Sequence, residues 1–306
     1  MTIADRKLTS TLQRNASARN PGMALDEALS AASSLAVRFW GVRGSVACPG
    51  PKTLRYGGNT PCVEIRCGSH TLIFDAGTGI RQLGSALIQA SDTSAFDIFL
   101  SHGHLDHVVG LPFFSPLFVN NQVVRVWAGS LQPAGGVEKA VRNLMSFPFF
   151  PLQVDALHAK LEFHDFRAGD TINPRPGVTL RTAPLHHPGG SVGYRIEYGG
   201  RSVAYVTDVE LGDGPIDPAL LALTKDAGLL ILDSTYTNDE LPAHTGWGHS
   251  SWQQGIRLAN AAGAKRLCLF HHDPDHDDEF LDKVGNAAEA MRPGTLVAKE
   301  GLNIQL

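Results

Sequence analysis

The chain has 306 residues, of which 43% are hydrophobic and 18% are charged. A chain of this length and apolar content can build a large core, which excludes general disorder. It contains no run of 18 apolar residues, so a membrane-spanning helix is excluded and no membrane partner is expected. The formal net charge of −4 disfavours binding to nucleic acid through charge alone, so nucleic acid is not a favoured partner.

The cysteine and histidine residues indicate metal chemistry rather than cross-linking. The four cysteines form no Cys-x-x-Cys pair and are typical of free thiols in a reducing compartment, so we expect a cytoplasmic protein. The 13 histidines are many for a chain of this kind, and histidine is a common ligand of transition metals.

Two regions of different character divide the chain. Residues 1–35 are rich in small polar residues and lack the basic start and apolar stretch of a signal peptide. We expect them to form a mobile N-terminal extension, with a short helix possible at Leu25–Leu35. Residues 36–306 contain no linker or repeat and are predicted to form one domain.

Strand and helix patterns alternate through this domain. The strands are expected at Ala36–Trp40, Cys62–Arg66, Thr71–Phe74, Phe96–Leu100, Val123–Trp127, Lys160–Phe163, Val178–Thr182, Tyr194–Tyr198, Ser202–Val206, Leu229–Leu232 and Arg266–Phe270. The helices are expected at Gly79–Ala90, Val137–Met145, Pro218–Asp226, Ser251–Ala262 and Asp278–Met291. Because hairpin-like turns accompany the alternation, the pattern predicts an α/β fold with mixed sheets.

The start of the helix at Ser251–Ala262 is marked by two overlapping Ser-x-x-Gln capping boxes, which begin at Ser250 and Ser251. Gly263 supplies its C-terminal stop. This arrangement puts His249 just before a helix N-terminus, whose partial positive charge suits a phosphate group near Ser250.

The sharpest pattern in the sequence is Ser101-His102-Gly103-His104-Leu105-Asp106-His107, directly after a predicted strand. Three imidazoles and a carboxylate within six residues can converge on one point. These groups suit zinc, iron or manganese.

This pattern resembles the His-x-His-x-Asp-His signature of the metallo-β-lactamase superfamily, which implies an αββα four-layer sandwich with two mixed β-sheets. Asp75, in Asp75-Ala-Gly77-Thr-Gly79, then matches the acid that supports the metal loop without binding metal. A dinucleotide-binding fingerprint is rejected for this segment, because the third glycine falls at Gly84, two residues late.

The resemblance also implies the remaining ligands. His187 is favoured over its neighbour His186, because the ligand in related phosphodiesterases lies six residues before a Gly-Tyr-Arg. His186 is then expected to pack near the site. Asp208 matches the bridging carboxylate, and His271 the last ligand, with His272 as the alternative.

Seven ligands in family order imply two divalent metal ions. Zinc, Zn²⁺, is the most favoured, with Mn²⁺ or Fe²⁺ as alternatives, and a bridging hydroxide would attack the substrate. The implied metal ligands are His102, His104, Asp106, His107, His187, Asp208 and His271. As a ligand of this metal pair, Asp106 is also expected to be one of the catalytic residues.

A second motif distinguishes between branches of the superfamily. Gly248-His249-Ser250-Ser251 resembles the His-Ser-Thr motif of RNase Z and its phosphodiesterase relatives, with Ser251 in place of threonine. In that branch the histidine protonates the departing oxygen, which implies that His249 is a general acid. Asp233, at a predicted strand end, is expected to orient it.

The segment from His187 to Asp208 argues for a small substrate. In RNase Z the arm that grips tRNA is inserted between these two ligands, whereas here two strands and a Gly199-Gly200 turn fill the 21-residue spacing. The chain therefore most resembles hydrolases of small or cyclic phosphodiesters, such as cyclic nucleotides. It lacks the zinc-binding cysteine cluster of the enzymes that act on cyclic ribose phosphates. An RNase Z-like endoribonuclease and a non-hydrolytic nucleotide-binding protein remain the alternatives.

Aromatic residues near these motifs have two interpretations. Residues 111–150 contain six phenylalanines, which we expect to form core or a subunit interface, as in a homodimer, rather than a lid. Trp247 and Tyr236 are candidates for stacking on a base. The acidic stretch Asp273–Asp278 lacks the glycine of an EF-hand and is expected to favour the start of the following helix.

Overall fold

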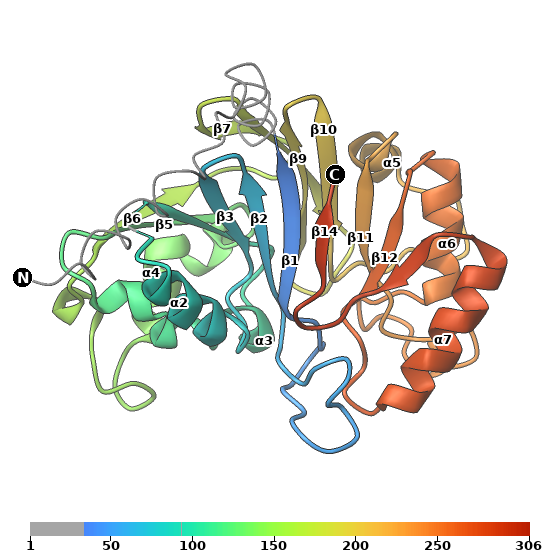
Figure 1. Ribbon diagram of the computed structural model, residues 1–306, viewed down its shortest axis with the longest axis horizontal. Helices are drawn as coiled ribbons and strands as arrows, with labels where there is room; N and C mark the ends of the chain where they lie inside the picture. Colours follow the sequence, from blue (N-terminus) through green and yellow to red (C-terminus); the bar gives the residue numbers. More distant parts are fainter. Residues whose placement is uncertain (1–33, 93) are drawn as a thin grey trace, which may run out of the picture.

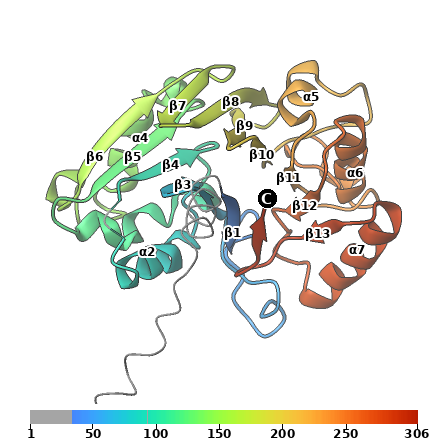
Figure 2. The same ribbon diagram turned by 45° about the horizontal axis from the view of Figure 1, so that its top comes forward.

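The computed structural model describes residues 34–92 and 94–306. Two seven-stranded β-sheets pack face to face, and helices cover the outer side of each (Figures 1 and 2). The predicted αββα sandwich is therefore confirmed. The expected extension, with its helix at Leu25–Leu35, lies outside the described residues except for its last two positions. No helix in the described ranges is long and apolar enough to cross a membrane.

The first sheet is formed mainly by the N-terminal half of the domain. Its strands lie in the order β14 (Asn303–Gln305), β1 (Leu35–Gly41), β2 (Cys62–Cys67), β3 (His70–Phe74), β4 (Phe96–Leu100), β5 (Val123–Ala128) and β6 (Lys160–Asp165). The strands from β3 to β6 run parallel, and the others are antiparallel to their neighbours. Its helices are α2 (Ile80–Gln89), α3 (Leu105–Val108) and α4 (Val137–Leu144).

The second sheet has a corresponding arrangement. Its strands lie in the order β13 (Thr295–Val297), β12 (Leu267–Phe270), β11 (Leu229–Asp233), β10 (Arg201–Val206), β9 (Ser191–Tyr198), β8 (Val178–Leu185) and β7 (Thr171–Arg175). The strands from β10 to β13 are parallel, and those from β7 to β10 are antiparallel. Its helices are α5 (Pro218–Thr224), α6 (Trp252–Ala261) and α7 (Asp278–Met291).

Every strand and helix expected within residues 36–306 is present, but three strands were missed. β13 and β14 have only three residues each, too few for an alternating pattern to stand out. β7 contains Pro174, which argues against a strand from sequence. It is tolerated there because β7 lies at the edge of its sheet.

Three apolar clusters hold the layers together. Aromatic side chains from both sheets meet in the central one, which includes Phe74, Phe99, Tyr194 and Tyr205. A second cluster lies between the first sheet and its helices, and a third lies between the second sheet and α5, α6 and α7. Burial of apolar surface in these layers drives the packing of the sandwich.

The strand directions bring the polar loops to one edge. β3 and β4 are parallel, and so are β10, β11 and β12, while β8 is antiparallel to β9, which is antiparallel to β10. The carboxyl ends of β8, β10, β11 and β12 therefore share an edge of the second sheet. Three residues just beyond strand ends, Asp75, Asp208 and His271, have positive φ angles, which turn the chain sharply there.

Candidate metal centre

The histidine loop begins where β4 ends. His102 and His104 lie in the extended stretch after the strand, while Asp106 and His107 lie in the short helix α3. Because the backbone changes from extended to helical here, His102 and His104 belong to one group of donors, and Asp106 and His107 belong to another.

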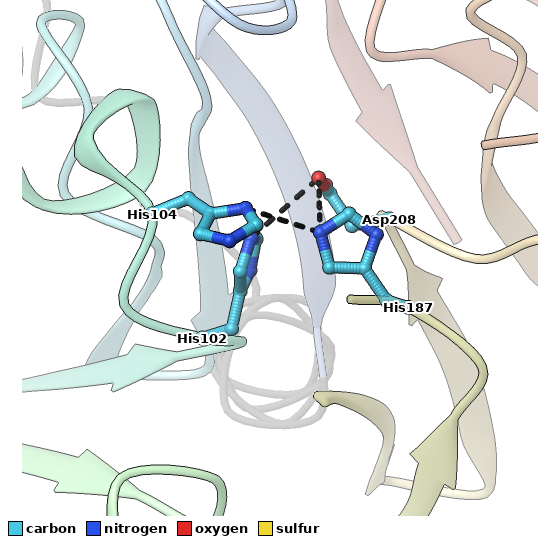
Figure 3. A group of neighbouring side chains, drawn as sticks. All are labelled: His102, His104, His187 and Asp208. Carbon is cyan, nitrogen blue, oxygen red and sulfur yellow. Dashed lines mark hydrogen bonds and ion pairs between the residues drawn. The ribbon is translucent and has the colours of Figure 1, made fainter. Parts of the chain in front are cut away.

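The first group consists of His102, His104, His187 and Asp208, whose donor atoms lie within 4.8 Å of one another. Figure 3 shows the three imidazoles and the carboxylate converging, with His102 and His104 from one side and His187 and Asp208 from the other. His104 Nδ1 lies 3.1 Å from His187 Nε2. His104 is the exposed member, so the group is open to solvent on its side.

The second group consists of Asp106, His107 and His271, again with donor atoms within 4.8 Å. His107 Nε2 lies 3.3 Å from His271 Nε2 and 3.2 Å from Asp106 Oδ2. Asp208 reaches this group too, because its Oδ1 lies 3.1 Å from His107 Nε2. Its other oxygen, Oδ2, lies 3.7 Å from Nε2 of His102. The carboxylate thus lies between the groups, as expected of a bridge.

The structure shows which histidine of each adjacent pair, His186–His187 and His271–His272, lies in a donor group. His187 is buried in the first group, whereas His186 is exposed, so its expected packing role is wrong. His272 is buried but points elsewhere, with its Nε2 2.8 Å from the carbonyl oxygen of Ala298. Burial lowers the pKa of His272 to about 3, so it is a neutral donor to that carbonyl.

Hydrogen bonds at Nδ1 fix the imidazoles so that Nε2 faces inward. His107 Nδ1 donates to Asp75 Oδ2 at 2.8 Å, and His187 Nδ1 donates to the Gly248 carbonyl at 2.9 Å. His271 Nδ1 lies 3.1 Å from Thr235 Oγ1. Partners of this kind orient metal-binding histidines.

Asp75 serves both sheets. It accepts hydrogen bonds from the backbone and side chain of Ser101 and from the Tyr205 hydroxyl, in addition to His107. Four donors leave its oxygens fully used, which agrees with a supporting acid that is not a ligand. The sequence pattern gave no sign of the Ser101 and Tyr205 contacts.

The donor set fits metal ions. His102 Nε2 is buried without a hydrogen-bond partner, although an unpaired buried nitrogen is costly. Burial lowers the pKa of His102 and His187, which keeps both imidazoles neutral and able to bind a cation. Burial opposes ionisation of Asp106 and Asp208, but the adjacent histidines hold the pKa of both carboxyls well below the usual range. The neutral imidazoles of His102 and His187, together with the two ionised carboxylates, suit divalent transition metals.

His249 lies beside both groups and is nearly buried. Its Nδ1 lies 2.7 Å from Asp233 Oδ2, the carboxylate that ends β11. Its ring stacks on that of His271, with centroids 5.0 Å apart. Burial disfavours its charged form, but Asp233 outweighs this and raises the pKa of His249 to about 9. His249 also lies in a third donor group with Asp208 and His271, so its position alone permits metal binding as well.

The start of α6 differs from the prediction. Ser251 is the N-cap and forms the capping box with Gln254, whereas Ser250 forms none. Ser250 instead directs its hydroxyl to the Val209 carbonyl and its amide towards Asp233. The amides of Ser251 and Trp252 also have partners within the protein. The phosphate contact expected at this N-terminus is therefore not supported.

The aromatic candidates divide by exposure. Tyr236 is buried and stacks on His244, so it cannot stack on a base, whereas Trp247 is 59% exposed. In the segment 111–150, Phe114 belongs to the core under α2, but Phe147 and Phe149 are exposed.

The acidic stretch Asp273–Asp278 acts as expected at its end, where Asp277 caps α7.

A comparison with family models matches residues 70–272 to the beta-lactamase superfamily domain. The chain belongs to the metallo-β-lactamase superfamily. Its curated relatives include the ribonuclease Z of Myxococcus xanthus, 23% identical over 295 residues that cover 81% of this chain and 92% of the relative. This likeness supports the resemblance to the RNase Z-like branch.

Two solved structures superpose on this architecture. The metallo-β-lactamase fold protein YhfI of Bacillus subtilis superposes with a TM-score of 0.65 at 19% identity, and the match covers 89% of this chain and 100% of YhfI. A diphosphatase of the PhnP family superposes with a TM-score of 0.64 at 18% identity, covering 89% and 98%. With its histidine and aspartate groups, this member of the superfamily is a metal-dependent hydrolase.

Proposed function

We propose that the protein hydrolyses small or cyclic phosphodiesters, with cyclic nucleotides as the leading substrates. The observation that carries the proposal is the 2.7 Å contact between His249 and Asp233 beside both donor groups. A phosphodiester has an alkoxide leaving group, which departs readily only when it receives a proton. A protonated histidine next to the metal centre can supply it.

Each residue has a defined task in this proposal. His102, His104 and His187 would hold one ion, Asp106, His107 and His271 would hold the other, and Asp208 would serve both. Two such ions, for which Zn²⁺ is the favoured metal, would activate water and stabilise the charge on the phosphate. Asp233 orients His249 through Nδ1 and favours its charged form, which leaves Nε2 to face the leaving oxygen.

The segment between His187 and Asp208 supports a small substrate. β9 and β10 with their Gly199-Gly200 turn use nearly all of it, so it carries no arm that could hold tRNA. The net charge of −4 also provides no general attraction for a polyanion.

The main alternative is an RNase Z-like endoribonuclease, which is favoured by the curated relatives. The test compares kcat/KM for cyclic AMP and cyclic GMP with that for a precursor tRNA, using one enzyme preparation and one metal. Efficient cleavage of cyclic nucleotides supports the proposal. Cleavage of the tRNA 3′ end with inert cyclic nucleotides would favour the nuclease. Tight binding of nucleotides without turnover would indicate a binding protein.

A further inference from the structure

The loop that joins β1 to β2 begins alongside the second donor group. Its first residues pair with the chain just after β12: the Gly44 amide donates to the His272 carbonyl at 2.8 Å, and the His272 amide donates to the Val42 carbonyl at 2.9 Å. Arg43 and His272 form a parallel bridge there. The loop is thus fixed next to the ligand His271.

Two residues of this loop contact Asp106 and His271, which are two of the three donors of the second group. The Ser45 amide donates to Asp106 Oδ2 at 2.8 Å. Gly44 packs so closely on His271 that an added Cβ would lie 2.4 Å from its ring. The position of residues 44 and 45 therefore determines where the Asp106 carboxylate and the His271 ring lie.

The side chain of Arg43 holds the loop in this position. It is fully buried, and its guanidinium donates to three carbonyl oxygens: Gly57 at 2.8 Å, Asp273 at 3.1 Å and His276 at 2.5 Å. Gly57 belongs to the same loop, and the other two carbonyls lie just after His271 in the chain. Burying a guanidinium without partners is costly, so these bonds are needed to keep the side chain in place. The planar fork of arginine can join three carbonyls in fixed directions, which lysine cannot do.

We propose that Arg43 is a positioning residue that sets the metal affinity of the group Asp106, His107 and His271. It acts through Gly44 and Ser45 and touches neither the ions nor the substrate. None of the hydrogen bonds of Arg43, Gly44 or Ser45 reaches His102, His104 or His187, so these three donors should bind metal without help from the loop. Asp208, which faces both groups, is retained in both backgrounds of the test. The proposal concerns metal binding and does not depend on which substrate the enzyme cleaves.

The test measures Zn²⁺ binding to metal-free protein by calorimetry in two backgrounds that each retain one group. His102→Ala leaves the second group, and His271→Ala leaves the first. Adding Arg43→Gln should weaken binding by roughly 10–100-fold in the His102→Ala background and leave it unchanged in the His271→Ala background. Arg55→Gln is the matched control, because Arg55 lies in the same loop but is exposed and pairs with Asp282 on α7.

Equal affinity with and without Arg43→Gln in the His102→Ala background would overturn the proposal. Equal weakening in both backgrounds would overturn it as well, because it would indicate a general loss of structure. If Arg43→Gln fails to fold, Arg43→Lys and Gly44→Ala replace it, with melting temperature as the check on folding. Both should lower Zn²⁺ affinity selectively at the second group, and unchanged affinity in both would refute the role of the loop.

Discussion

His249 Nδ1 and Asp233 Oδ2 lie 2.7 Å apart, although Asp233 belongs to the second sheet and His249 to the loop before α6. Asp233 is the last residue of β11, and His249 lies two residues before the N-cap of α6. The contact fixes the ring of His249 and favours its protonated form. His102 and His187, by contrast, are kept neutral by burial.

Replacement of His249 by alanine should separate substrates by their leaving groups. We expect His249→Ala to keep its metals and its fold but to lose roughly 10²–10⁴-fold in kcat on a cyclic nucleotide, whose alkoxide needs a proton. Bis(p-nitrophenyl) phosphate should lose much less, because p-nitrophenolate departs unprotonated. Steady-state kinetics on both substrates with metal analysis test this, and equal losses would assign His249 a role other than proton transfer.

The pH profile should depend on Asp233. Because Asp233 raises the pKa of His249 to about 9 in the metal-free protein, the acid is charged below that pH and loses its proton as the pH rises through it. Bound cations lower this value in wild type and variant alike. Asp233→Asn removes the stabilising charge, so the alkaline fall in kcat should move to lower pH.

The control for this experiment is His249→Ala, which should show no such alkaline fall. An alkaline limb at the same pH in wild type and Asp233→Asn would exclude His249 as the group that titrates.

Asp208 should be needed for both ions, since its two oxygens face different donor groups. Asp208→Ala should lower the metal content below the two ions expected per chain and abolish hydrolysis. His186→Ala is the matched control, because this exposed residue lies next to a ligand but outside both groups. Elemental analysis after dialysis measures the outcome, and two retained ions with full activity would contradict the assignment.

Trp247 is expected to contact the base of a nucleotide substrate. It lies two residues from His249, and Glu210 holds the loop by accepting the amides of Gly246 and Gly248 at 3.0 and 2.9 Å. Its ring meets His244 edge-on. Trp247→Ala should raise KM for cyclic AMP about 5–150-fold, the worth of one stacked base.

Trp247→Phe should retain part of this affinity, and a base-free cyclic ribose phosphate should be unaffected by either substitution. An unchanged KM for cyclic AMP in Trp247→Ala would place the base elsewhere.

The sequence predicted the sheets and the ligand loop for physical reasons that do not extend to the whole site. The loop from His102 to His107 is recognisable because its donors are adjacent in the chain. The choice of His187 over His186 needed the family resemblance, since both have the same chemistry and only the fold buries one of them. The Ser45 contact could not be foreseen, because a backbone amide carries no residue-specific signal. Ser250 was misassigned because two serines offered the same capping pattern.

The ligands come from both sheets: four follow β4, and His187, Asp208 and His271 follow strands of the second sheet. Bound ions would therefore link the two sheets, and their binding energy would add to the free energy of unfolding. At a free metal concentration 100 times the dissociation constant, each ion adds about 2.7 kcal/mol. Resistance to heat should rise with free metal concentration, and a chelator should allow the two sheets to part at a lower temperature.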